Sequence, residues 1–267
     1  MARDVSANKL IQDLESELQL RKKGEWDGRF WAEKGLVGHR KRCVKLLGEY
    51  KSIEAIPVLT SLYKYSNGLQ RTEILQKGLR EIAHSSSIEF LVEVVQKGYF
   101  GEPNSFDMKI LSDQGSFLNN HKRSAAWALC MIEDDVAHKR ICELVQNKEC
   151  PSPYSILGPM FTYLGRSKRP ETNELLAKCL EIEYSFFRFP TLQKILSVIS
   201  EYSGKEALAP LCKILDYKYF SENLGISLSL ENHVLLTLES VVNRLTHGIS
   251  LEDREKGLIS LKGKIVD

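Results

Sequence analysis

The chain has 267 residues, of which 43% are hydrophobic and 27% charged, a balance typical of a folded globular protein rather than a disordered one. Its 37 basic and 35 acidic residues leave a net charge of +2, which lacks the basic excess of a dedicated nucleic-acid-binding protein. No apolar segment of signal-peptide length opens the chain and no run of about 18 apolar residues occurs, so we expect a cytoplasmic protein without a membrane span.

The first predicted element is an amphipathic helix over residues 6–21. Ser6 is the expected N-cap, Leu10 and Leu14 fall on one face, and Gly24 is expected to end the helix. A terminal helix with a polar outer face is typical of the cap of a stack of helices, so residues 1–36 are assigned as an N-terminal cap.

A short aromatic loop follows this helix. Trp26, Phe30 and Trp31 either close the open end of the stack by packing or, together with Arg29, form a binding hot spot. The sequence leaves both alternatives open.

The rest of the chain reads as pairs of short helices joined by tight turns. Pro57 and Pro170 both fall in the first turn of a helix, where a missing N–H is tolerated. Ser86 or Ser87 is the expected cap of the second helix of the second pair. The six pairs are expected at about 39–65, 74–95, 123–145, 155–184, 191–216 and 230–261.

The longest connection lies within residues 98–120 and contains Tyr99, Phe100 and Phe106. Insertions of this length in repeat proteins often carry function.

Two of the helix pairs repeat each other in sequence. The segment from Leu46 to Tyr63 aligns without a gap with the segment from Val198 to Leu215, at an offset of 152 residues, which is four times 38. A period of this size is typical of stacked supersecondary units. The fold prediction is therefore an all-α protein, an α-solenoid of about six stacked helical hairpins in a single domain over residues 1–267.

The repeated motif resembles the short form of the HEAT-repeat family, the form found in proteins like the bilin lyases. The run from Arg42 to Gly48, Arg-Cys-Val-Lys-Leu-Leu-Gly, followed by Ala-Ile-Pro-Val-Leu at 55–59, matches the two helices of that repeat. The similarity covers roughly residues 37–262 and implies an armadillo-like solenoid that binds other proteins. The ladder of Asp and Arg that many members carry is not recognisable here.

Sequence motifs for catalysis are missing from the chain. The six histidines form no HExxH motif, the six cysteines form no CxxC pair, and there is no P-loop, GxGxxG or GxSxG. We interpret the cysteines as free, buried thiols of a protein in a reducing compartment. We therefore expect no catalytic residue, no cofactor and no metal site, and a protein that is not an enzyme.

Aromatic residues recur where the second helix of each pair ends, and basic residues lie among them. They either pack the turns between pairs or form a rim that grips a partner. The candidate partner-binding residues are Trp26, Arg29, Trp31, Tyr99, Phe100, Phe106, Phe187, Arg188, Tyr217, Tyr219 and Phe220.

The leading functional hypothesis is a non-enzymatic scaffold or adaptor that binds another protein, with an immunity-type inhibitor as one form of it. The alternative is a nucleic-acid-directed protein such as a base-excision enzyme, for which Trp127, Arg123 and Asp134 or Asp135 supply suitable residue types. We expect Trp127 to be a core residue instead, because it stands among alanines and leucines of an apolar stripe.

Overall fold

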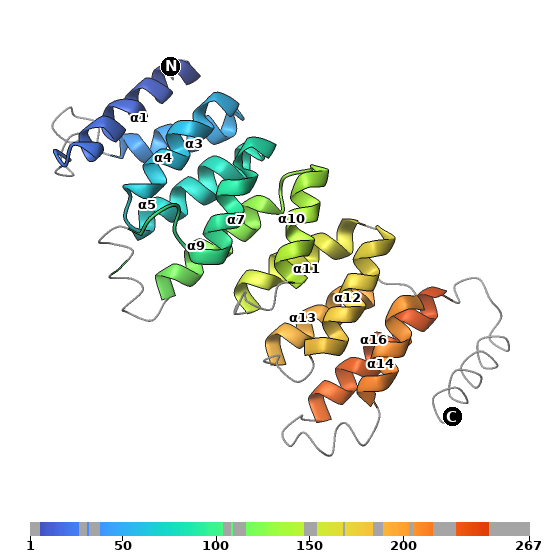
Figure 1. Cartoon of the computed structure of the whole chain (residues 1–267). Coiled ribbons are helices and arrows are strands. Elements are labelled where there is room, and N and C mark those ends of the chain that lie inside the picture. Colours follow the sequence, from blue (N-terminus) through green and yellow to red (C-terminus); the bar gives the residue numbers. More distant parts are fainter. Residues whose placement is uncertain are drawn as a thin grey trace. The chain divides into compact units, whose positions relative to one another are not determined.

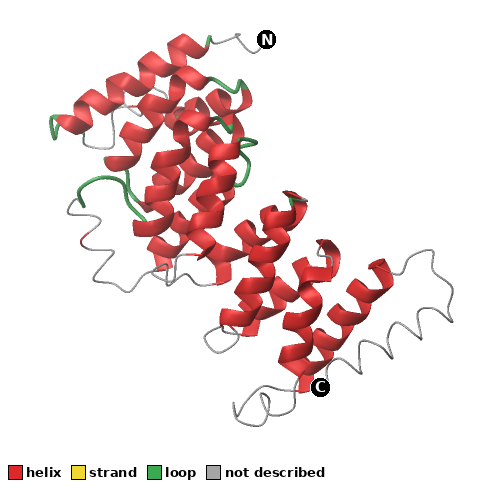
Figure 2. Ribbon diagram, turned by 45° about the vertical axis from the view of Figure 1, so that its right-hand side comes forward, coloured by secondary structure: helices red, strands yellow, loops and turns green. Residues whose placement is uncertain are grey.

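The computed structural model describes residues 6–26, 31, 38–103, 108, 116–146, 154–167, 169–183, 189–202, 205–215 and 228–245. All regular structure in these ranges is helical and no strand occurs in them (Figures 1 and 2). The all-α prediction is confirmed. None of the helices described there has the length and apolar character needed to cross a membrane.

Helices occur in each predicted pair, but the second pair begins at Gly68 rather than at residue 74, and the third begins at Ser116 rather than at residue 123. Their bounds are α1 Ala7–Lys22, α3 His39–Glu49, η1 Ile53–Ala55, α4 Ile56–Lys64, α5 Gly68–Glu73, η2 Ile74–Leu79, α6 Arg80–Ile82, η3 Ser85–Ser87, α7 Ile88–Lys97, α9 Ser116–Leu129, α10 Asp135–Gln146, α11 Tyr154–Ser167, α12 Pro170–Glu183, α13 Phe189–Tyr202, η4 Lys205–Ala207, α14 Leu208–Leu215 and α16 Leu228–Leu245. The predicted final helix at 250–261 lies outside the described residues.

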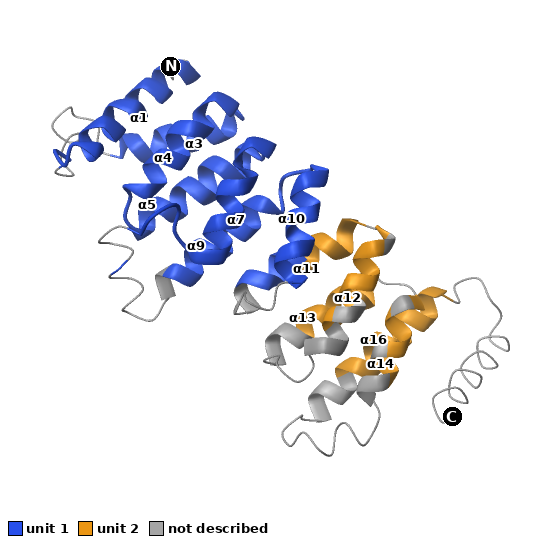
Figure 3. Ribbon diagram, viewed as in Figure 1, with its two compact units in different colours: residues 1–160 blue, residues 161–267 orange. Residues whose placement is uncertain are grey.

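The chain divides into two compact units, residues 1–160 and residues 161–267 (Figure 3). Within the first unit, α1 packs on α3 and α4, these two pack on η2, and α7 packs on α9. Within the second unit, α12 packs on α13 and α14, which both contact α16. A single stack of six hairpins through both units stays a prediction.

The core of the first unit comes from apolar residues spaced at three and four positions along each helix. Leu10 and Leu14 of α1, Leu47 of α3, Leu59 of α4 and Leu91 of α7 are all essentially inaccessible to solvent. This spacing places the side chains on one face of each helix, where they remove apolar surface from water.

Helix ends confirm some of the predicted signals and correct others. Ser6 is the N-cap of α1 and its hydroxyl oxygen accepts from the N–H of Lys9 at 3.4 Å, while Gly24 adopts a left-handed φ of 74° just after the helix. Ser87, one of the two predicted caps, is the N-cap residue of α7, but its side chain makes no capping hydrogen bond. The Nδ1 atom of His84 accepts from the N–H of Ser86 at 3.2 Å instead, because His84 is the extended residue that precedes the turn.

The predicted repeat appears in the secondary structure. A 3₁₀ turn at Ile53–Ala55 leads into α4 at Ile56, and a 3₁₀ turn at Lys205–Ala207 leads into α14 at Leu208. Subtracting 53 from 205 gives the offset of 152 residues found in the sequence. The two segments therefore share backbone structure as well as residue types.

The first helix of the second pair contains a π-helical segment, η2, which the sequence did not predict. It faces α3 at very close range. A Cβ atom added to Gly48 would clash with the carbonyl oxygen of Lys77, so only glycine permits this approach of the two backbones. Gly78, within the same segment, has more room, since its added Cβ would lie 3.1 Å from a Leu59 methyl carbon.

Candidate binding groove

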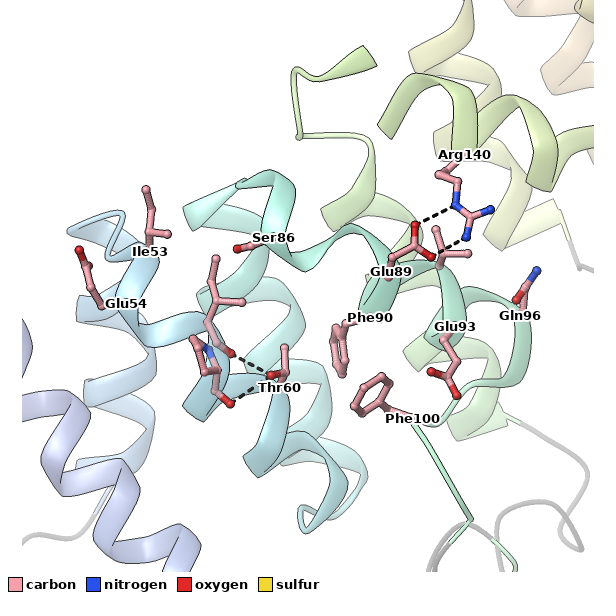
Figure 4. Close-up of a pocket in the computed structure, with 13 residues that line it drawn as sticks. Ile53, Glu54, Thr60, Ser86, Glu89, Phe90, Glu93, Gln96, Phe100 and Arg140 are labelled. Atoms are coloured by element: carbon pink, nitrogen blue, oxygen red, sulfur yellow. Dashed lines mark hydrogen bonds and ion pairs between the residues drawn. The ribbon is translucent and has the colours of Figure 1, made fainter. Parts of the chain in front are cut away.

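The first unit contains a groove between the second helices of the first two pairs. Its volume is about 640 Å³. One wall comes from η1 and α4, the other from η3 and α7, and Arg140 of α10 and Phe100 close it (Figure 4). The lining residues are Ile53, Glu54, Ile56, Pro57, Thr60, Ser86, Glu89, Phe90, Val92, Glu93, Gln96, Phe100 and Arg140.

The apolar part of the groove centres on two phenylalanines. The rings of Phe90 and Phe100 lie 4.8 Å apart, edge to face, next to each other in Figure 4. Phe90 is almost fully buried, whereas Phe100 is half-buried and offers part of its ring. Ile53 adds an exposed apolar side chain, with 45% of its surface accessible.

A backbone turn places Phe100 in the groove. Gly98 ends α7 with a left-handed φ of 85°, and its carbonyl oxygen accepts from the hydroxyl of the buried Tyr63 at 3.0 Å. The N–H of Gly101 donates to Glu93 at 3.0 Å. The segment after α7 is therefore fixed on both sides of Phe100.

The polar part of the groove is acidic. Three carboxylates, Glu54, Glu89 and Glu93, and one guanidinium group, that of Arg140, line the groove, which gives its lining a formal charge of −2. Just outside the lining, Nζ of Lys97 pairs with Glu93 at 3.0 Å. Arg140 donates from Nε to Glu89 at 3.0 Å and from Nη1 to Glu143 at 2.8 Å. These hydrogen bonds raise the pKa of Arg140, so this residue stays charged.

A second groove of about 600 Å³ lies between α1 and α4. It is lined by Gln12, Glu15, Ser16, Leu18, Gln19, Pro57, Val58 and Ser61. Pro57 lines both hollows, so the two grooves adjoin at the first turn of α4. Glu15 adds a further carboxylate to this surface.

The predicted partner-binding residues fall into four groups, one of which is the buried Trp31 alone. Phe100 lies in the groove, with Tyr99 half-buried next to it in sequence. Trp26 lies under the guanidinium group of Arg21, 4.4 Å from its ring centre. The remaining predicted residues, other than Trp31, lie outside the described residues: Arg29, Phe106, Phe187, Arg188, Tyr217, Tyr219 and Phe220.

Trp31 packs inside the first unit, with 7% of its surface exposed. Its indole N–H donates to Glu17 at 2.7 Å. The carboxylate of Glu17 is fully buried, accepts from Nε of Arg21 at 2.7 Å and lies 3.5 Å from Nε of Arg40. Burial lowers the pKa of Arg40 to about 10, although Glu17 acts in the opposite direction. This arrangement agrees with the packing alternative for Trp31.

The prediction that Trp127 is a core residue is wrong, because 43% of its surface is exposed. Ala125, Ala126, Ala128 and Leu129 take the buried positions of α9, and Trp127 falls on the other side of the helix. The guanidinium carbon of Arg80 lies 6.0 Å from the centre of its ring.

One cluster of metal-ligand residue types occurs in the described part of the chain, formed by Asp13, His39 and Cys43. The sequence reasoning missed the cluster, although His39 and Cys43 are four residues apart on one helix. It also missed the groove carboxylates. Glu54 and Glu89 both stand near the start of a second helix, a recurrence visible in the sequence.

Comparison with known protein families finds no family model that matches this chain, and comparison with curated proteins finds no similar sequence. The resemblance to HEAT repeats therefore remains a prediction from the repeated motif.

Proposed function

We propose that the protein is a non-enzymatic scaffold of the HEAT-like solenoid type, which binds a segment of a partner protein along the grooves flanking α4. The observation that carries the proposal is the groove between α4 and α7, with its paired phenylalanine rings and acidic rim. A groove of this size holds a few side chains of an extended chain, and the adjoining hollow beside α1 lengthens the binding surface.

The negative charge of the groove favours a partner segment that carries positive charge. Glu54 and Glu89 stand on opposite walls, and Glu93 lies one turn beyond Glu89 on α7. A segment in which apolar side chains alternate with Lys or Arg would place the apolar groups on Phe90 and Phe100 and the cations at the rim. Complementary charge of this kind also excludes acidic segments.

A direct test uses a fluorescein-labelled peptide of alternating Leu and Lys, with a Leu–Glu peptide of equal length as its counterpart. Fluorescence anisotropy should show binding of the basic peptide and none of the acidic one. The double variant Glu54→Lys, Glu89→Lys should weaken binding about tenfold or more, because each reversal replaces an attraction with a repulsion. Equal affinity for both peptides would contradict the proposal.

Glu133→Lys provides the matched control. Glu133 is exposed in the turn between α9 and α10, outside the groove, and its reversal changes the net charge in the same direction. If Glu133→Lys weakens binding as much per charge as the groove variant does, the peptide responds to overall charge and the groove is not its site.

A second candidate function, nucleic-acid binding, is favoured by the exposed ring of Trp127 beside Arg80. Bases stack on such rings and cations attract the phosphates. Binding of labelled single-stranded DNA at about 50 mM salt, lost at higher salt and weakened by Trp127→Ala, would support it. No binding at that salt concentration would count against it.

A further inference from the structure

Three side chains of different chemistry meet at one point between α1 and α3. Nε2 of His39, the first residue of α3, lies 2.8 Å from Oδ2 of Asp13 and 3.3 Å from Sγ of Cys43. All three atoms lie within 4.8 Å of one another. They present nitrogen, oxygen and sulfur together, the set of ligand atoms that zinc takes in proteins.

Hydrogen bonds cannot pair all three of these side chains well at the same time. The same nitrogen of His39 faces both the carboxylate of Asp13 and the sulfur of Cys43. If Nε2 carries a hydrogen, it can donate well to only one of them, and it cannot then accept from the thiol. A cation at the centre would bind a lone pair from all three atoms at once.

We propose that Asp13, His39 and Cys43 bind a divalent transition-metal ion, Zn²⁺ being the best match, with a fourth position open to water. Zinc–ligand distances of about 2.0–2.3 Å in a tetrahedral arrangement place N and O about 3.4 Å apart, and N and S about 3.6 Å apart. The observed separations of 2.8 and 3.3 Å therefore need to open by about 0.6 and about 0.3 Å, and the oxygen and the sulfur lie within 4.8 Å of each other.

The surroundings orient the ligands and leave a path for the ion. Nζ of Lys9 binds the other carboxylate oxygen of Asp13 at 3.0 Å, which keeps Oδ2 directed at His39. The ring of Trp31 lies 4.6 Å from that of His39 and supports it. The side chains of Asp13 and His39 keep 17% and 15% of their surface exposed, so the site opens to solvent while Cys43 lies buried beneath it.

An ion here would join the terminal helix α1 to the first helix of the first pair. The ligands from α1 and α3 are 26 residues apart in sequence, so the bound ion would hold the N-terminal cap in place. Metal binding should therefore stabilise the first unit. The proposal does not depend on the groove, whose residues do not overlap with this cluster.

The chain contains a matched comparison on α10. His138 and Cys142 have the same spacing of four residues, with Sγ and Nε2 3.6 Å apart. No carboxylate joins them as a third ligand among the described residues. Removing the thiol of Cys142 therefore controls for a chance His–Cys pair.

The experiment titrates the metal-free full chain with Co²⁺ under argon and follows absorption. We expect one equivalent to produce thiolate-to-cobalt charge-transfer absorption together with the visible bands of tetrahedral Co²⁺, both removed by one equivalent of Zn²⁺. Cys43→Ser should abolish the charge-transfer absorption, Asp13→Asn should weaken binding tenfold or more, and Cys142→Ser should leave both unchanged.

A thermal measurement keeps the test independent of the buried cysteine. Zn²⁺ at a hundred times its dissociation constant should raise the folded-to-unfolded ratio of the wild-type chain about a hundredfold, and hence its Tm. Asp13→Asn, which preserves shape at a partly exposed position, should lose most of this rise. Absence of cobalt absorption in the wild type, its persistence in Cys43→Ser, or its equal loss in Cys142→Ser would overturn the proposal.

Discussion

The buried carboxylate of Glu17 offers a quantitative test of what holds the N-terminal cap in place. Its carboxylate accepts from Nε of Arg21 and from the indole N–H of Trp31, both at 2.7 Å, and lies 3.5 Å from Nε of Arg40. The substitution Glu17→Gln keeps the side-chain volume but removes the charge. The two guanidinium groups, each with only 7% of their side chain exposed, then lose the charge of Glu17, and Arg40 keeps only the weaker attraction of Glu73.

Removing one partner of a buried ion pair costs about 3–5 kcal/mol. With a urea dependence of about 2 kcal/mol per M, a loss of about 4 kcal/mol lowers the unfolding midpoint by about 2 M. The exposed pair of Lys45 and Glu49 gives the control, since both side chains are about half exposed or more. Glu49→Gln should cost less than about 1 kcal/mol.

Tryptophan fluorescence is a suitable probe because all three tryptophans, at positions 26, 31 and 127, belong to the first unit. The signal therefore reports the unfolding of the unit that contains Glu17, whatever the second unit does. The reasoning is refuted if Glu17→Gln shifts the urea midpoint no further than Glu49→Gln does.

Four other predictions use the same urea assay. Gly48→Ala should destabilise the first unit by about 1–3 kcal/mol, because the new methyl group clashes with backbone, and Gly78→Ala should cost less; equal costs would contradict this ranking. Tyr63→Phe should cost about 1–3 kcal/mol, since it leaves a buried carbonyl oxygen without its donor, and no measurable loss would argue against that hydrogen bond. Trp127→Ala, with urea unfolding followed by circular dichroism, should change the free energy of unfolding by less than about 0.5 kcal/mol, because the side chain is exposed. A large loss of stability would show that Trp127 is a core residue after all. Burial raises the pKa of Glu73, against the opposing effect of nearby cations, so the folded state favours the protonated carboxyl group. The resulting stabilisation is fully present below the ordinary pKa of Glu73 and is lost as the pH rises through the raised pKa. The variant Glu73→Gln should therefore gain stability relative to wild type between pH 4 and pH 7, and a difference that does not change with pH would contradict this.

Local features of the fold could be predicted from the sequence because neighbouring residues determine them. Ser6 caps α1 through a contact three residues away, and Pro57 marks the first turn of α4. The alignment of residues 46–63 with residues 198–215 indicated that the two segments share a helix pair, although the 3₁₀ turns at Ile53–Ala55 and Lys205–Ala207 were not predicted.

Features that depend on tertiary contacts could not be predicted in this way. Arg140 meets Glu89 across 51 residues, so neither residue identifies the groove by itself. Trp127 stands beside four residues that are buried, and only the orientation of the helix decides that its own side chain is exposed. No signal in the sequence predicted the π-helical segment at Ile74–Leu79, whose backbone comes close to Gly48.

The shared 3₁₀ turn has a consequence for how such a chain can change length during evolution. One residue inserted into the turn at Ile53–Ala55 would rotate all of α4 by about 100° and turn Leu59 and Leu62 away from the core. Recombination that duplicates or deletes a complete helix pair would instead leave every helix with its buried face unchanged. Natural variants of this protein should therefore differ by whole pairs, or by insertions in the long loops, while the residue count of this turn stays constant.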